Sequence, residues 1–285
     1  MPISLRTLGM IVLAIGTAVG LSALAFRSSR PGEPPPKLRW WGSLTVGLAF
    51  LVANFGIAPP AFPPDDVTDR IPWLALAAAI GAAILTGERG GIWGRVTGFV
   101  GLGVLLDLVI LGPVLGAGEY SEGTIIQLAS ITGISCLALV NIGLLDRPAN
   151  RSELWVALTV LAAGGAVVLV LANSAVLCLL GGSLALVLTA SLIGSRGRAI
   201  GGGIAVAATV LATLVIEGSV YAFLPAVSGL LLAGAPALLW LLRTGPIARL
   251  GPLTRSALAA ILILIPVGIA IFLVWSTQGF DHQGI

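Results

Sequence analysis

Residues 96–117 read Val96-Thr-Gly-Phe-Val-Gly-Leu-Gly-Val-Leu-Leu-Asp-Leu-Val-Ile-Leu-Gly-Pro-Val-Leu-Gly-Ala117. The stretch is long enough to cross a bilayer, which takes about 20 apolar residues. Asp107 lies at its middle, and no Lys, Arg or His lies within ten residues of it. A carboxyl group at that depth costs roughly 2.5–3.5 kcal/mol on insertion scales, so its surroundings must offset the cost. We therefore expect a membrane-spanning helix with Asp107 as a candidate functional group.

The composition of the whole chain agrees with this reading. Of the 285 residues, 57% are hydrophobic and only 9% are charged, whereas soluble domains have about 25% charged residues. A chain with so little charge cannot cover a water-soluble surface, so lipid must be its solvent. The 38 glycines suit close packing of helices in a membrane.

The same counts exclude several functions. The basic residues are scattered over short loops and form no stripe, so we expect no nucleic acid partner. The single histidine, His282, lies next to the C-terminus, while Cys136 and Cys178 fall inside apolar stretches. We expect no metal site, no cofactor, no disulfide and no catalytic constellation.

Hydropathy divides the chain into about ten spans, which predicts an all-α, polytopic transmembrane bundle forming one domain over 1–285. Asn173 alone separates the sixth and seventh spans, and Pro225 separates the eighth and ninth. The predicted spans are 8–26, 40–58, 71–87, 96–117, 123–145, 154–172, 174–194, 203–224, 226–242 and 256–275.

The distribution of charge predicts an orientation. Of the 15 basic residues, 13 lie in loops that follow odd-numbered spans, the exceptions being Arg6 and Arg70. By the positive-inside rule these loops face the cytoplasm, so we expect both termini outside a bacterial cytoplasmic (inner) membrane. We read residues 7–26 as a span rather than a signal peptide, because cleavage would leave the basic stretch 27–39 outside.

Glu217 is the second candidate functional residue. Thr209, Thr213, Glu217 and Tyr221 recur every four residues along the eighth span, which places them on one helical face. Such a stripe should face protein or water. It fits either one wall of a polar pathway or a hydrogen-bonded seam between helices. Asp107 has two corresponding readings, as a protonatable or cation-binding carboxyl and as a neutral, hydrogen-bonded structural acid.

The fifth span carries two amides, Gln127 and Asn141. They are 14 residues apart and therefore within about 40° of one face. Asn54 lies toward the outer end of the second span. Amides in spans most often form hydrogen bonds between helices, and we expect that role for all three.

Two resemblances are carried by short motifs. Tyr221-Ala-Phe-Leu-Pro225, Leu230-Leu-Leu-Ala-Gly-Ala-Pro236 and Ile71-Pro-Trp73 resemble uncharacterised planctomycete-type membrane proteins, which implies a polytopic bacterial membrane protein and no particular activity. Glu153, Gly164, Ala172-Asn173 and Gly181 are spaced similarly to positions in the antiporter-like subunits of respiratory complex I. This chain has Ser183 where that family has its intramembrane Glu, and no span contains Lys, which argues against that pumping mechanism.

The expected function is a non-catalytic scaffold or subunit of a membrane complex, with lipid and other membrane subunits as partners. The alternative is a small-solute or ion transporter that uses Asp107 and Glu217. An intramembrane lipid-modifying enzyme is a third reading, disfavoured by the missing catalytic groups.

Overall fold

The computed structural model describes residues 5–27, 41–62, 64, 68–85, 97–105, 109, 122–146, 151–195, 202–222 and 224–281. These residues are almost entirely helical, and no strand occurs among them. The predicted all-α class is therefore confirmed. Asp107 lies outside the described residues.

The helices begin and end within a few residues of the predicted spans. Of the span that contains Asp107, residues 97–105 and 109 are described, and they are helical. The remaining helices are α1 (Leu5–Arg27), α2 (Trp41–Ile57), α3 (Ile71–Leu85), α5 (Glu122–Leu145), α6 (Arg151–Leu171), α7 (Ala175–Gly194), α8 (Gly203–Tyr221), α9 (Ala226–Gly234) and α10 (Pro252–Asp281), with short 3₁₀ helices η1 (Thr68–Arg70), η3 (Ala235–Arg243) and η4 (Gly245–Arg249).

Six helical segments in the described part of the chain are long and apolar enough to cross a membrane. They are Leu5–Leu24, Arg151–Leu171, Ala175–Gly194, Gly203–Tyr221, Ala226–Arg243 and Pro252–Thr277, with Trp41–Ile57 and Thr132–Leu145 as shorter apolar helices. The chain is a multi-pass helical bundle with the composition of a membrane protein.

The turn at Asn173 shows how the sequence separates two adjacent helices. Asn173 has φ 63°, a left-handed conformation that Asn tolerates better than most residues. Ser174 then caps α7, because its hydroxyl accepts a hydrogen bond from the amide of Leu177 at 3.3 Å. One residue of reversed backbone and one cap are enough to end α6 and start α7, as predicted.

The segment from Ala226 to Arg243 changes its helix type at mid-length. The first nine residues are α-helical and the last nine are 3₁₀-helical, with Pro236 in the first turn of the second part. An α-helix rises about 1.5 Å per residue and a 3₁₀ helix about 2.0 Å, so the 18 residues reach roughly 31 Å. The predicted ninth span, 226–242, is shorter than the usual length of about 20 residues, and the 3₁₀ conformation extends it to the length of a bilayer core.

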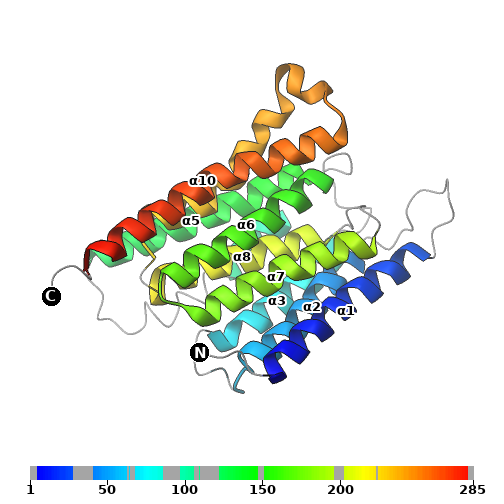
Figure 1. Ribbon diagram of the computed structural model, residues 1–285, viewed down its shortest axis with the longest axis horizontal. Helices are drawn as coiled ribbons and strands as arrows, with labels where there is room; N and C mark the ends of the chain where they lie inside the picture. Colours follow the sequence, from blue (N-terminus) through cyan, green and yellow to red (C-terminus); the bar gives the residue numbers. More distant parts are fainter. Residues whose placement is uncertain are drawn as a thin grey trace.

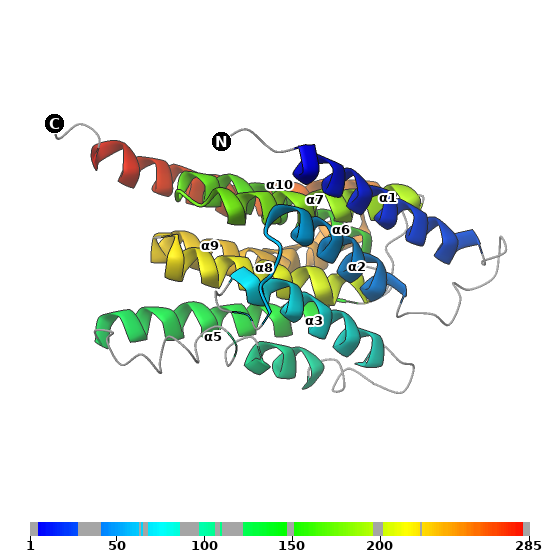
Figure 2. The same ribbon diagram turned by 90° about the horizontal axis from the view of Figure 1, so that it is seen from below.

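The helices are stacked in three layers, which Figure 2 shows edge-on. One outer layer contains α10, α6, α7 and α1, and the middle layer contains α9, α8 and α2. The other outer layer contains α5, the helical residues 97–105 and α3. Figure 1 views the stack from the first of these layers, with α10 and α1 at its two edges.

Helix α8 is the centre of this arrangement. It packs against α6 and α7 on one side, α3 and α5 on the other, and α2 and α9 within its own layer. As a result 94% of this span is buried within the bundle, against 17% for the peripheral α1. A polar group on α8 is thereby shielded from lipid by its neighbours.

The helix ends that border the basic loops lie together at one end of the bundle. Contacts at this end join Ser22 to Gly194, Gly42 to Gly203, Glu153 to Arg255 and Asn141 to Trp240. At the other end Thr7 donates a hydrogen bond to the carbonyl of Gly56 at 3.2 Å. Helix ends that flank loops assigned to one face by the charge pattern are thus neighbours in space.

Candidate functional site

The polar stripe of α8 is buried over three of its four residues. Thr209 donates its hydroxyl proton to the carbonyl of Ala205, and Thr213 donates to the carbonyl of Thr209, each at 2.9 Å. Both hydroxyls are therefore satisfied by their own helix and need no neighbouring helix or water. The expected seam between helices does not arise from these two donors.

Glu217 is only 1% exposed, whereas Tyr221, one turn further on, is 46% exposed. Positions four residues apart drift by about 40° per step around a helix, and Tyr221 is also the last residue of α8. Drift and position together carry the tyrosine out to the surface. In the predicted stripe, Thr213 and Glu217 are therefore buried and Tyr221 is exposed.

Asn54 of α2 is buried, and it lies at about the same position along the bundle axis as Glu217. The carbonyl of Gly42 lies beside Gly203, so the contacting helices α2 and α8 start together and run in the same direction. Asn54 follows that contact by about 18 Å and Glu217 by about 21 Å at 1.5 Å per residue. The amide of Asn54 has no hydrogen-bond partner among the described residues, so the expected interhelical bond is not made there.

The two amides of α5 do not form one site. Asn141 accepts a short hydrogen bond from the indole nitrogen of Trp240, which links α5 to η3 as predicted for a spanning amide. Gln127 lies on the same helix about 21 Å away at 1.5 Å per residue, and its side chain is outside the described residues. Asn141 is therefore a link between helices, at the opposite end of the bundle from Glu217.

Arg70 is a residue whose role the charge pattern does not reveal. It is one of the two basic residues outside the predicted cytoplasmic loops, and its guanidinium donates to the carbonyl of Val109 at 2.8 Å. This bond joins η1 to the segment that follows Asp107 in sequence. Asp107 itself, with its proposed role, lies outside the described residues.

Two ion pairs that hydropathy could not reveal lie at the end of the bundle with the basic loops. Arg151 is 2.9 Å from Asp146, joining the end of α5 to the start of α6. Arg255 is 2.8 Å from Glu153, joining α10 to α6. Both carboxylates are buried. These charges hold helix ends together, and none of the four residues lines the small cavity between α8 and α9.

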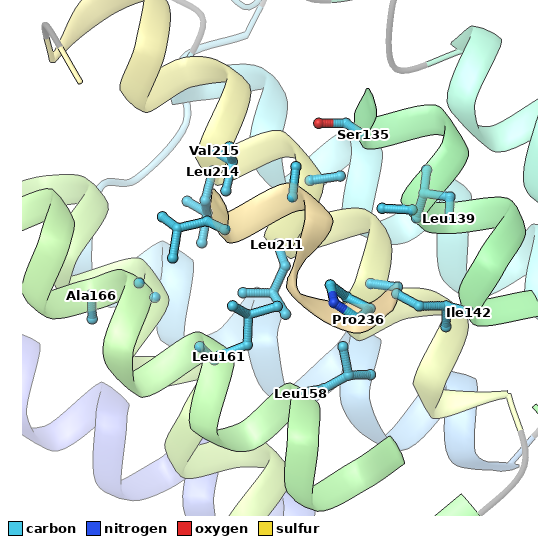
Figure 3. A pocket seen from close by; sticks show the side chains of 18 of the residues that line it. Ser135, Leu139, Ile142, Leu158, Leu161, Ala166, Leu211, Leu214, Val215 and Pro236 are labelled. Carbon is cyan, nitrogen blue, oxygen red and sulfur yellow. The ribbon is translucent and has the colours of Figure 1, made fainter. Parts of the chain in front are cut away.

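A small cavity lies between α8 and α9, bounded by α5 on one side and α6 on the other (Figure 3). Its volume is about 40 Å³ and its walls are almost entirely apolar, with Ser135 of α5 as its one side chain with a polar atom. Sites for drug-sized ligands occupy roughly 300–1,000 Å³. Glu217, Thr213 and Asn141 are not among the residues that line it.

The four predicted site residues whose side chains are described therefore do not lie together. Glu217 and Thr213 are enclosed in the centre, Asn141 is bonded to Trp240, and Tyr221 is at the surface. No cluster of three or more metal-binding side chains occurs among the described residues. No protein-family model matches the chain, and neither the curated proteins nor the solved structures contain a significant match.

Proposed function

We propose that this protein is a non-catalytic, multi-pass subunit or scaffold of a membrane complex. The observation that carries the proposal is the enclosure of α8, whose buried Thr209 and Thr213 bond to their own helix. A solute pathway needs polar groups along a shared cavity, whereas the described cavity is small and apolar. A rigid core with an apolar exterior is suited to holding partners in the bilayer.

The proposal includes a location and an orientation. We infer about ten spans in a bacterial cytoplasmic membrane, with both termini outside. The grouping of the basic-loop ends around the Glu153–Arg255 pair supports this orientation, because one end of the bundle would then carry most of the positive charge. Reporter fusions test it: an enzyme active only in the cytoplasm is expected to work at residue 150 and to be inactive at residue 62.

The functional test is recovery of a partner from native membranes. The full-length protein is crosslinked in the membrane, extracted in a mild detergent and purified through a terminal tag. We expect a second membrane protein to be recovered in a fixed ratio to this chain. As a control, the crosslinker is added only after the membranes have been extracted in detergent with excess lipid, and the second protein should then no longer be recovered. A chain that always elutes as a monomer without a partner would count against the proposal.

Transport is the second candidate, and it is favoured by one specific observation. Glu217 and Asn54 are both buried, on contacting parallel helices and at a similar level. A carboxyl and an amide so placed offer oxygen ligands to a cation or a proton. If Glu217→Gln abolishes ion or solute flux in vesicles while Thr209→Val does not, transport replaces the scaffold proposal.

A further inference from the structure

The junction between α9 and η3 leaves a backbone carbonyl without its usual donor. In an α-helix the carbonyl of Leu232 would accept from the amide of residue 236, but Pro236 has no N–H. The amide of Ala235, the residue before the proline, is bonded to the carbonyl of Leu231. Leu232 and Pro236 both line the small cavity, so the carbonyl that lacks its helical donor belongs to a residue of the cavity wall.

Ser135 brings a second polar group to the same cavity. Its side chain is 1% exposed, and its hydroxyl has no hydrogen-bond partner among the described residues. The hydroxyl of Thr132 on the same helix also lacks a partner, but Thr132 does not line the cavity, whereas Ser135 does. Figure 3 shows Ser135 on the wall formed by α5 and Pro236 on the wall formed by η3.

The size of the cavity limits what can join these two groups. One water molecule needs roughly 10–15 Å³ of such space, so a cavity of about 40 Å³ has room for about three waters. An engineered cavity that holds benzene measures about 150 Å³, so a ring-sized ligand does not fit. Water can both accept from a serine hydroxyl and donate to a carbonyl.

We propose that this cavity is a water-binding site within the membrane domain, in which ordered water links the Ser135 hydroxyl to the Leu232 carbonyl. Helix breaks at proline are tolerated in membranes where side chains or ordered water satisfy the freed backbone groups. The bound water takes the place of the hydrogen bond that Pro236 removes. It thereby holds the junction of α9 and η3 against α5.

A double-mutant cycle between Ser135 and Pro236 tests the site through reversible unfolding of the full-length protein in mixed micelles. Ser135→Ala should raise the unfolding equilibrium constant about tenfold, because it leaves the Leu232 carbonyl buried without a partner. In a Pro236→Ala background the alanine amide at position 236 can donate to the Leu232 carbonyl. Ser135→Ala should then change the unfolding equilibrium constant less than about twofold. Thr132→Ala, which removes another buried hydroxyl of α5 outside the cavity, should not depend on residue 236.

If the cavity holds no water, Ser135→Ala should change stability in the opposite direction. Ser135→Ala would then be neutral or stabilising, since it removes a buried hydroxyl that bonds to nothing. Should Pro236→Ala not fold, a high-resolution structure of the wild-type protein in lipid provides the answer. Density within hydrogen-bond distance of Ser135 Oγ and the Leu232 oxygen supports the site. A cavity without such density, or one that takes up xenon instead, overturns it.

Discussion

The guanidinium of Arg255 lies 2.8 Å from the carboxylate of Glu153, although the two residues are 102 positions apart in the sequence. The pair connects the first turns of α10 and α6, which pack against each other along their length. The carboxylate is almost completely buried and the arginine largely so. Breaking such a pair leaves a charge in a poorly hydrated place, which is costly.

Glu153→Gln is expected to destabilise the bundle by about 2–3 kcal/mol, slightly below the usual range for buried pairs because Arg255 keeps some contact with water. The double variant Glu153→Gln/Arg255→Gln should recover part of that loss. Reversible unfolding in mixed micelles measures both. Asp146→Asn is the matched control, and it should cost less because its pair joins helices that are consecutive in the sequence. Strictly additive effects of the two substitutions would contradict the assigned pairing.

Neighbouring glycines of α6 should respond oppositely to alanine. A Cβ at Gly164 would lie 2.3 Å from Val267 Cγ1 of α10, whereas a Cβ at Gly165 would meet no atom within 4 Å. Gly164→Ala should therefore cost about 1–3 kcal/mol through overpacking, and Gly165→Ala should be neutral or slightly stabilising. Adding Val267→Ala should relieve the Gly164→Ala defect. Equal effects at the two glycines would show that α6 and α10 do not pack in this register.

The glycines of α1 provide a test of the peripheral position of that helix. Gly16 and Gly20 have the spacing of a small-residue packing motif, but they have open space where a Cβ would be. By contrast, a Cβ at Gly194 of α7 would lie 2.7 Å from the carbonyl oxygen of Val19. Gly16→Ala and Gly20→Ala should leave the melting temperature of the isolated protein unchanged, while Gly194→Ala should lower it. A lower melting temperature for Gly20→Ala would mean that this face of α1 packs against another helix.

Much of the fold follows from one-dimensional patterns. Helix boundaries, the turn at Asn173 and the break at Pro225 are set by local chemistry, and hydropathy and backbone preference detect local chemistry well. The packing of the helices is different, because apolar side chains suit both lipid and protein neighbours. Helices α1 and α8 have nearly the same hydropathy, yet one is peripheral and the other central. Mean hydropathy therefore does not distinguish the two helices.

The site was less predictable for a related reason. A four-residue spacing correctly indicated that Thr209, Thr213 and Glu217 share a buried face, but it could not show that the threonines bond to their own helix. Trp240 as the partner of Asn141, and Glu153 as the partner of Arg255, depend on tertiary contacts between distant segments. The role of Asp107 remains a prediction.

The threonine bonds lead to a further expectation. Thr213→Val should change stability by less than about 1 kcal/mol, because the lost hydrogen bond is local and its acceptor keeps its own helical donor. Thr209→Val should behave in the same way, and unfolding titrations measure both. A loss of several kcal/mol in either variant would mean that the hydroxyl binds a neighbouring helix or an ordered ligand.

The most direct measurement is the chemical accessibility of the α8 stripe in intact membranes. Cysteine is placed singly at Thr213, Glu217 or the exposed loop position Thr244, in a background where Cys136 and Cys178 are alanine, and a membrane-impermeant maleimide is applied to both faces. If α8 is enclosed by its neighbours, as proposed, the cysteine at 244 should be modified rapidly, and those at 213 and 217 only after denaturation. Rapid reaction at 213 or 217 in the native membrane would reveal an aqueous pathway along α8 and contradict the account.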